Sequence, residues 1–205
     1  MGETWEQLRL GNITCSRFSD VMTNDRSGKG FGKTARTYMD EVISEILTQQ
    51  PASQVKTFAM EHGHQYEPVA REAYEQKSGN KVEDAGIVKL VGHRITGSPD
   101  GFVGTDGIIE IKCPLTFVPH LRVVESCCMP DEHAEQVQGY LWLTGRQWCD
   151  FISFHPLFPE PLQLMVIRVE ANKEFHKQLE ERVFAFEAEL MNRLKSIVQF
   201  MKGRT

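Results

Sequence analysis

The spacing of hydrophobic residues predicts helices through the first third of the chain. Ile13-Thr14-Cys15-Ser16 is typical of a helix N-cap, with apolar residues at helical spacing behind it. A loop rich in glycine and basic residues is expected over 23–33. Apolar side chains then recur at intervals of three and four over 34–49. A third helix is expected over 57–77, where Ser78-Gly79-Asn80 is a suitable C-terminal stop.

From residue 85 the hydrophobic period changes to that of β-strands. Apolar segments bounded by turn residues predict strands over 86–91, 94–96, 102–103, 108–112, 150–154 and 162–169. The first four of these predict a β-meander, with Gly104-Thr105-Asp106-Gly107 as its last turn. A helix is expected over 132–143, and apolar residues from Phe175 to Ile197 predict a long amphipathic helix at the end. This order predicts an α/β or α+β fold in which helices pack on one sheet.

Composition narrows the class of protein. The chain has 205 residues, of which 40% are hydrophobic and 25% charged, so we expect one globular domain over 1–205. No apolar run approaches the roughly 18 residues needed to cross a bilayer, and the first residues do not resemble a signal peptide. The five cysteines are odd in number and show no Cys-x-x-Cys spacing. A zinc ribbon, an iron–sulfur cluster and a disulfide framework are therefore not expected, and we predict a cytoplasmic protein with no membrane partner.

The net charge argues against one class of DNA-binding protein. Lys and Arg number 23 against 28 Asp and Glu, which gives −5 at neutral pH. Proteins that coat nucleic acid are usually basic, because their affinity comes from neutralising phosphates. An acidic enzyme can still act on DNA if its basic residues line a groove and its carboxylates hold metal ions.

Two carboxylates and a lysine are expected to meet on one hairpin. Residues two apart on a strand point to the same face, so Glu110 and Lys112 project together, and the turn brings Asp100 beside them. Two carboxylates on one edge suit a hard divalent cation such as Mg²⁺, with the backbone carbonyl of Ile111 as a further ligand. Lys112 could position or deprotonate a water, or stabilise charge in the transition state. These are the parts needed for metal-assisted phosphodiester hydrolysis.

A purely structural interpretation of the same residues stays open. Asp100 lies between a proline and a glycine, which is ordinary turn chemistry, and alternating Glu and Lys on a strand often form a solvated face. The surrounding Ile108, Ile109 and Ile111 favour a strand that is buried on at least one face. Buried charges there would need partners or a metal.

Two predicted helices carry further candidates. Glu67 shares a helix face with Gly63 and Arg71, and a small residue there would let the helix approach a sheet. Gln136 and Tyr140 are four apart and also share a face. A glutamine on the core-facing side of a helix needs a polar partner, which an active site can supply. The alternative for both Glu67 and Gln136 is an exposed side chain without a role.

Together these residues resemble the PD-(D/E)XK nuclease signature: Pro-Asp, then Glu-x-Lys, then a Gln-x-x-x-Tyr helix. More narrowly, the chain resembles the phage lambda exonuclease branch, also called the YqaJ-type viral recombinases. The resemblance spans residues 5–155 and its motifs occur in the family's order. They are Trp5 to Ser16, His62-Gly63 to Glu67 with Ala70-Arg71, Ser98-Pro99-Asp100-Gly101, Glu110-Ile111-Lys112-Cys113-Pro114 and Gln136-Val137-Gln138.

The resemblance implies a restriction-endonuclease-like PD-(D/E)XK core with a central mixed sheet flanked by helices. It also implies a Mg²⁺-dependent 5′→3′ exonuclease that digests one strand from a double-stranded DNA end, with two ions and with Mn²⁺ able to substitute. Members of the family act as ring-shaped homotrimers beside a single-strand annealing protein in recombination. A phage- or prophage-encoded protein in the cytoplasm of a bacterial host is therefore expected.

The resemblance also assigns roles to individual residues. Asp100, Glu110 and the Ile111 carbonyl correspond to metal ligands, and Glu67 corresponds to the carboxylate that serves a second metal or positions the water. Lys112 would be the catalytic lysine, oriented by Gln136. The residues in the places where the family grips the terminal 5′-phosphate are Arg9, Ser16 and Ser98. Further DNA contacts are assigned to Arg26 and Lys29 on the inner wall of the ring, to Arg122 and to Tyr140, although Arg26 and Lys29 could instead belong to a solvated loop.

One departure and two alternatives stay open. The family pattern can place an arginine shortly after the Cys-Pro pair, whereas Leu115-Thr116-Phe117-Val118-Pro119 follows Pro114 here. Either Arg122 reaches the phosphate from the next turn, or the preference for a 5′-phosphate is weaker. A structure- or site-specific endonuclease on the same fold, and a nuclease-fold protein that binds DNA or a partner without cutting, are the alternative functions.

Overall fold

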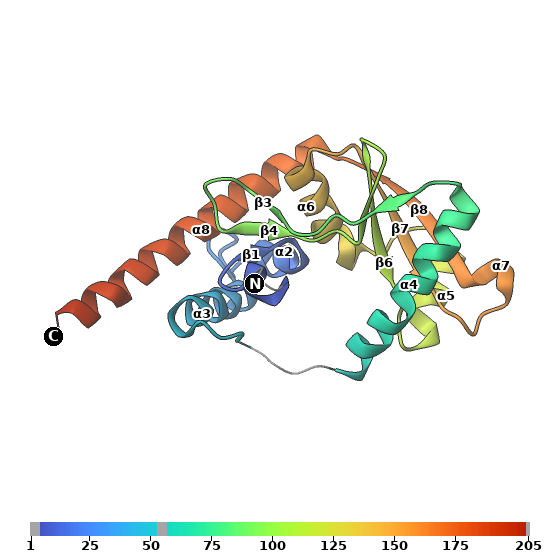
Figure 1. Cartoon of the computed structure of the whole chain (residues 1–205). Coiled ribbons are helices and arrows are strands. Elements are labelled where there is room, and N and C mark those ends of the chain that lie inside the picture. Colours follow the sequence, from blue (N-terminus) through green and yellow to red (C-terminus); the bar gives the residue numbers. More distant parts are fainter. Residues whose placement is uncertain (1–4, 53–56, 204–205) are drawn as a thin grey trace.

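The structure is a computed structural model that describes residues 5–52 and 57–203 of the chain. It consists of helices and two groups of strands (Figure 1). The α-helices are α1 (Trp5–Arg9), α2 (Phe18–Met22), α3 (Lys33–Thr48), α4 (Phe58–Ser78), α5 (Phe117–Ser126), α6 (Ala134–Thr144), α7 (Glu160–Gln163) and α8 (Lys173–Lys202). Two short 3-10 helices are η1 (Cys15–Arg17) and η2 (Asp131–His133).

Within the described residues the strands form two sheets. The strands are β1 (Ile13–Thr14), β2 (Val82–Glu83), β3 (Val88–Lys89), β4 (Ile95–Gly97), β5 (Gly101–Val103), β6 (Gly107–Lys112), β7 (Trp148–Phe154) and β8 (Leu164–Glu170). The smaller sheet has the order β1-β4-β3, and the larger one has the order β2-β5-β6-β7-β8. In the larger sheet only β6 and β7 are parallel. The expected mixed sheet flanked by helices is therefore confirmed.

Helices cover both faces of the larger sheet. Successive residues of β6 point to opposite sides of this sheet, so the strand contacts helices on each face. Ile109 and Ile111 pack with Ala70 and Tyr74 of α4 in one hydrophobic cluster. Ile108 faces the other way, into the larger cluster that contains residues of α3, α6 and α8. Glu110 and Lys112 share the face of Ile108 and so lie on the α6 side, while α4 covers the opposite face (Figure 1).

Local sequence explains where the main helices begin and end. The hydroxyl of Thr57 accepts a hydrogen bond from the backbone N–H of Met60 at 3.2 Å, which caps the start of α4. Gly79, in the left-handed conformation with φ +72°, ends the same helix. Pro68 lies inside α4 and lacks the N–H that would bond to the carbonyl of His64. The helices expected over 34–49, 57–77 and 132–143 and the long C-terminal helix are thus found within one or two residues, except that α8 runs further at both ends.

Several sequence-based expectations about the strands are wrong. The segments expected to form one meander belong to two sheets: β3 and β4 pair in the smaller sheet, whereas β5 and β6 pair in the larger one. Ile13-Thr14 forms β1, which pairs in parallel with Ile95 and Thr96 of β4. Thr14 is also the N-cap of η1, so the predicted helix start is present, but without a side-chain capping hydrogen bond. Strand pairing between such distant segments leaves no periodic signal in either segment. Helix α5 was not expected either, because Pro119 interrupts its apolar pattern.

None of the helices in the described ranges has both the length and the hydropathy needed to span a bilayer. The C-terminal half of α8 extends past the other elements (Figure 1).

Candidate active site

The β5–β6 hairpin positions the first carboxylate. Gly101 pairs with Ile109, and the backbone N–H of Asp100 donates to the carbonyl of Ile109 at 3.1 Å. The carboxylate of Asp100 then accepts a hydrogen bond from the backbone N–H of Ile111 at 2.5 Å. Asp100 is therefore held beside Glu110 and Lys112, as was predicted from the turn between the two strands.

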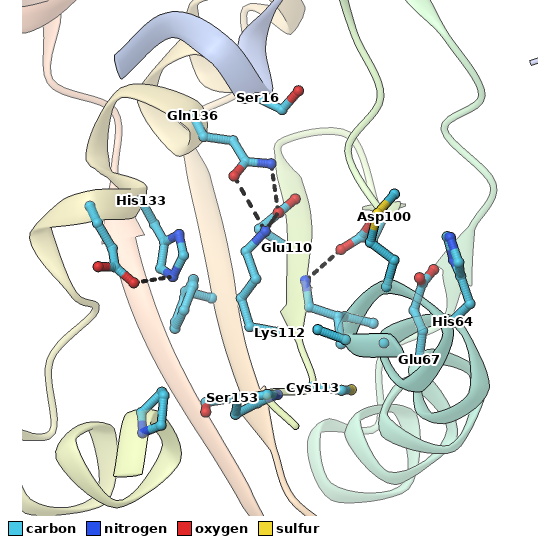
Figure 2. Close-up of a pocket in the computed structure, with 18 of the residues that line it drawn as sticks. Ser16, His64, Glu67, Asp100, Glu110, Lys112, Cys113, His133, Gln136 and Ser153 are labelled. Carbon is cyan, nitrogen blue, oxygen red and sulfur yellow. Dashed lines mark hydrogen bonds and ion pairs between the residues drawn. The ribbon is translucent and has the colours of Figure 1, made fainter. Parts of the chain in front are cut away.

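Glu110, Lys112 and Gln136 form one hydrogen-bonded group (Figure 2). The Nζ of Lys112 lies 2.7 Å from Oε1 of Glu110 and donates to Oε1 of Gln136 at 3.3 Å. The Nε2 of Gln136 donates to Oε1 of Glu110 at 2.7 Å and to the hydroxyl of Tyr140 at 3.0 Å. Gln136 and Tyr140 share one face of α6, so the polar partner expected for a core-facing glutamine is present.

Glu110 is buried and Asp100 is half-buried, and Lys112 is the cation paired with Glu110 among the described residues. Glu110 is only 2% exposed, and its Oε2 has no hydrogen-bond partner among the described residues. Burial raises the pKa of Glu110, although the Lys112 ammonium opposes this. Burial and the charge of Glu110 raise the pKa of Asp100 well above its usual range. Burial alone would lower the pKa of Lys112, but its pair with Glu110 outweighs this and raises it.

Helix α4 brings Glu67 and Arg71 to the opposite side of the hairpin. Glu67 lines the same pocket, and its charge contributes to the raised pKa values of Asp100 and Glu110. Arg71 donates to the backbone carbonyl of Asp100. The prediction that a small residue at Gly63 lets this helix approach the sheet is wrong, because a Cβ at this position would meet no atom within 4 Å. The helix reaches the hairpin without needing a small residue there.

A pocket of about 510 Å³ connects these residues with the N-terminal segment. Arg9, Ser16 and Ser98 all line it. The guanidinium of Arg9 donates to the hydroxyl of Ser16 at 3.1 Å and lies over the ring of Trp5, 4.4 Å from its centre. The indole N–H of Trp5 donates to the hydroxyl of Ser98 at 3.3 Å. The three residues predicted to bind a phosphate are therefore brought together beside the carboxylates.

The remaining candidates lie elsewhere, apart from Tyr140. Arg26 and Lys29 are exposed in the loop before α3, and neither lines this pocket. Arg122 is exposed on α5 and is also absent from the pocket lining, although Pro119 and Val123 of the same helix belong to it. Tyr140 lines the pocket and is buried.

Sequence reasoning did not single out Trp5, His64 or His133 as site residues, yet all three line the pocket. Trp5 lies in the N-terminal motif and could have been found from the arginine four residues later, which can stack on it. His133 precedes Gln136 by three residues, so the helical spacing already placed the two side by side. His64 gives no such signal.

The residues present fit a divalent cation. Asp100 and Glu110 offer two adjacent carboxylates, and the unpartnered Oε2 of Glu110 is an oxygen that a cation would satisfy. Among the described residues, no group of three or more His, Cys, Asp or Glu side chains is arranged to hold a metal. A cation there would complete its shell with backbone oxygen and water, as Mg²⁺ commonly does.

Comparison with known proteins identifies the family. The family model described as YqaJ-like viral recombinase domain matches residues 4–147. The chain belongs to this family. No curated protein matches the chain.

Solved structures extend the similarity of this YqaJ-family chain over its length. It is 33% identical to the alkaline exonuclease LHK-Exo from Laribacter hongkongensis, with a TM-score of 0.89 and 98% of each chain covered. The same values hold for LHK-Exo in complex with dAMP. A phage-related exonuclease from Haemophilus somnus 129PT is 16% identical, with a TM-score of 0.74 over 91% of this chain and 96% of that chain, and shows the fold alone. These findings confirm the PD-(D/E)XK-type fold and support a nuclease enzyme.

Proposed function

We propose that this protein is a Mg²⁺-dependent exonuclease that degrades one strand of a DNA duplex from its 5′ end. The observation that carries the proposal is the pocket in which Asp100, Glu110 and Lys112 lie beside Arg9, Ser16 and Ser98. The first group is suited to phosphodiester hydrolysis, and the second to a phosphate at a strand end. The full-length similarity to an alkaline exonuclease supports the same activity.

In this proposal the hairpin residues hold the cation. Asp100, Glu110 and the carbonyl of Ile111 are the ligands, and Glu67 serves a second ion or positions the water. Bound Mg²⁺, with Mn²⁺ as a substitute, would supply Lewis-acid stabilisation of charge on the phosphate oxygens. A cation would also offset the burial and the neighbouring negative charges that raise the pKa values of Asp100 and Glu110.

Lys112 and Gln136 act on the scissile phosphate. Lys112 stays protonated beside Glu110, so it serves as a positive charge for the phosphate in the transition state. Gln136 accepts from Lys112 and donates to Glu110, which fixes the direction of the ammonium group. Its amide therefore couples the lysine to the metal-binding carboxylate.

Arg9, Ser16 and Ser98 bind the terminal 5′-phosphate. A guanidinium and two hydroxyls are suitable donors for phosphate oxygens. LHK-Exo has been solved in complex with dAMP, which supports a nucleoside monophosphate as the unit released here. With Arg122 outside the pocket lining, Arg9 is the only arginine of the described residues that lines the pocket. We therefore propose a 5′-phosphate preference that depends mainly on Arg9.

Residues in and around the pocket are proposed to contact the DNA. Arg26, Lys29 and Arg122 are proposed to contact the DNA backbone, and Tyr140 to contact the strand within the pocket. The protein would act as a ring-shaped homotrimer and supply 3′ single-stranded DNA to a single-strand annealing protein during phage-type recombination in a bacterial host.

A strand-labelled substrate tests the proposal. Purified protein is incubated with linear duplex DNA that carries a 5′-phosphate on one strand only, with and without Mg²⁺, beside a closed circular duplex. We expect Mg²⁺-dependent loss of the phosphorylated strand from its 5′ end, with the circle intact. The Arg9→Ala variant should lower the ratio of rates on 5′-phosphate and 5′-hydroxyl ends about tenfold, whereas Arg17→Ala, outside the pocket, should not. A cut circle would favour the endonuclease, and no cleavage with Mg²⁺ or Mn²⁺ would favour a protein that only binds DNA.

A further inference from the structure

Thr14 lies behind the group of residues proposed to bind the terminal phosphate. It belongs to β1, is only 6% exposed and is not among the residues that line the pocket. Ser16, two residues later, is exposed and lines the pocket. The two hydroxyls are hydrogen-bonded, with 3.1 Å between Oγ1 of Thr14 and Oγ of Ser16. The hydroxyl of Thr14 therefore reaches the pocket through Ser16.

The hydroxyl of Thr14 does not make the contact that its position favours. Thr14 is the N-cap of η1, where a threonine oxygen commonly accepts a hydrogen bond from a backbone N–H, but its side chain forms no such bond. Its backbone N–H donates to the hydroxyl of Tyr38 at 2.9 Å, and β1 pairs it with Thr96 of β4. The backbone of Thr14 is thus fixed, and its hydroxyl is directed to Ser16.

Burial decides which of the two hydroxyls donates. If Ser16 donated to Thr14, the buried proton of Thr14 would need another acceptor. The Tyr38 hydroxyl is within reach of the Thr14 side chain, but it already accepts from the backbone N–H of Thr14 and has a buried proton of its own to place. A buried donor without an acceptor costs free energy, whereas the exposed Ser16 can donate to water or to a ligand. The arrangement of lower cost has Thr14 donating to Ser16.

This direction leaves the proton of Ser16 for the pocket. The guanidinium of Arg9 also donates to the oxygen of Ser16, at 3.1 Å. A hydroxyl has two lone pairs and one proton, so with both lone pairs occupied Ser16 has a donor to offer. The oxygens of a phosphate dianion accept hydrogen bonds and do not donate. Ser98 differs from Ser16, because its hydroxyl donates to the carbonyl of Gly86 at 2.8 Å and would have to leave it to donate to a phosphate.

We propose that Thr14 is a positioning residue for recognition of the terminal 5′-phosphate: its hydroxyl donates to Ser16 and so directs the proton of Ser16 to the phosphate. This inference rests on the proposed function, and within it on the preference for a 5′-phosphate. A 5′-hydroxyl end can both donate and accept, so its recognition does not depend on the direction of the Ser16 proton. Loss of the Thr14 hydroxyl should therefore weaken the preference without slowing the cleavage of a hydroxyl end.

Thr14→Val tests this role, because it removes the hydroxyl and keeps a β-branched side chain. Cleavage rates are measured with Mg²⁺ on linear duplexes that carry either a 5′-phosphate or a 5′-hydroxyl, at enzyme concentrations below the DNA Kd. We expect the ratio of the two rates to fall about fivefold, as for the loss of one neutral hydrogen bond. The rate on the hydroxyl end should stay within twofold of the wild type. Thr14→Ser, which keeps a hydroxyl, should retain the wild-type ratio within twofold.

Thr96→Val is the matched control. Thr96 is the partner of Thr14 in the register of β1 and β4 and is 1% exposed. Its hydroxyl has no hydrogen-bond partner among the described residues. The same substitution at this position should leave both cleavage rates within twofold of the wild type.

A double-mutant cycle tests whether Thr14 acts through Ser16. Ser16→Ala should lower the ratio at least as much as Thr14→Val does. Adding Thr14→Val to Ser16→Ala should lower the ratio no further, because the group that Thr14 positions is already gone.

Three results would overturn the proposal: a Thr14→Val ratio within twofold of the wild type, an equal loss of the ratio in Thr14→Ser or Thr96→Val, or a further fivefold loss when Thr14→Val is added to Ser16→Ala. If Thr14→Val does not fold, Thr14→Ala is judged by the same criteria. Equal wild-type rates on the two ends would overturn the phosphate preference and the role of Thr14 with it. A wild-type protein that cuts no DNA would overturn the exonuclease function, and the ratio of the DNA Kd values for the two ends, measured with Ca²⁺, would then decide the role of Thr14.

Discussion

At the residue scale, the main feature is a buried glutamate, Glu110, beside a half-buried aspartate, Asp100, because removing their charges from water costs free energy. Asp100 and Glu110 both have raised pKa values, and Lys112 contacts only one of the four carboxylate oxygens. A buried charge without a full set of partners destabilises the folded state. Such groups are retained where function requires them, which is why this pair is a stronger indicator of a site than an ordinary ion pair.

Replacing Asp100 by asparagine should therefore stabilise the metal-free protein. The folded-state pKa of Asp100 lies above its unfolded-state value, so stability falls as the pH rises from the unfolded-state value through the folded-state pKa. Above that pH we expect Asp100→Asn to raise the free energy of unfolding in EDTA by about 1–2 kcal/mol, as measured by urea unfolding at pH 8. The gain should shrink at pH 4, and added Mg²⁺ should stabilise only the wild type.

Asp150→Asn is the control for this prediction. Asp150 is buried, but Arg168 donates to both of its oxygens, at 2.5 Å and 3.1 Å, and Tyr74 donates to one of them at 2.7 Å. Its replacement should destabilise the protein. If Asp100→Asn destabilised it as much at pH 8, Asp100 would be a structural residue.

Lys112→Ala should abolish cleavage while leaving DNA binding nearly unchanged. The ammonium acts on charge that develops in the transition state, so we expect a loss in kcat of about 10²- to 10⁴-fold with little change in Kd. Single-turnover cleavage and binding titrations measure the two effects separately. Lys177→Ala, which removes an exposed partner of Glu174 on α8, should cut DNA normally. Normal turnover by Lys112→Ala would contradict its catalytic role.

The residue pattern predicts the centre of the site better than its walls. Glu110, Lys112 and Asp100 follow from strand alternation and one turn, and Gln136 with Tyr140 follows from helix spacing. Local spacing places Trp5 beside Arg9 and His133 beside Gln136. That these residues line one pocket with the hairpin depends on tertiary packing, which a local period does not encode.

At the scale of elements, α6 connects the site to the N-terminal segment. Its Gly139 packs against Phe18 of α2, and a Cβ at this position would lie 2.7 Å from a ring carbon. Gly97 of β4 is equally confined, since a Cβ there would lie 2.9 Å from atoms of both Cys15 and Tyr140. Small residues at these contacts let the smaller sheet, η1 and α6 approach, and so bring Ser16 and Ser98 to Gln136.

Two glycine-to-alanine changes should have opposite effects on stability. Gly139→Ala introduces a methyl group against Phe18, and we expect it to cost about 1–3 kcal/mol. Gly63→Ala in α4 places its methyl in open space, and it should gain up to about 1 kcal/mol because alanine favours the helix. Chemical unfolding of both variants measures the difference. A stabilised Gly139→Ala would show that α6 can shift away from α2 at little cost.

The elements that the sequence predicts well are those in which apolar residues recur at regular spacing over a long segment. Helices α3, α4, α6 and α8 each carry several turns of apolar spacing, and β6 is fixed by its run of isoleucines. In the smaller sheet, β3 and β4 lie within or beside predicted strands, but their separation from the larger sheet was not predicted. These strands have two or three residues each, and β1 pairs with β4 across the chain.

At the scale of the whole molecule, the net charge of −5 needs to be reconciled with DNA as a substrate. Exposed carboxylates repel the phosphate backbone, and this repulsion weakens with salt. Among the described residues, Arg26 and Lys29 do not line the pocket, so within one chain this basic loop is separate from the site. A ring of several copies would solve this, because each copy could turn its basic residues toward one central channel.

We therefore expect the protein to be a homotrimer and its processivity to depend on assembly. One chain has a mass of 23.4 kDa, so sedimentation at micromolar concentration should give about three times that value. Diluting the protein below the concentration at which it assembles should shorten the tract removed per binding event, because an open monomer dissociates from the duplex whereas a closed ring stays threaded. Arg26→Ala combined with Lys29→Ala should reduce tract length without changing trimer mass. Processive digestion by a protein that sediments as a monomer would contradict the ring and would require the basic loop of a single chain to hold the duplex.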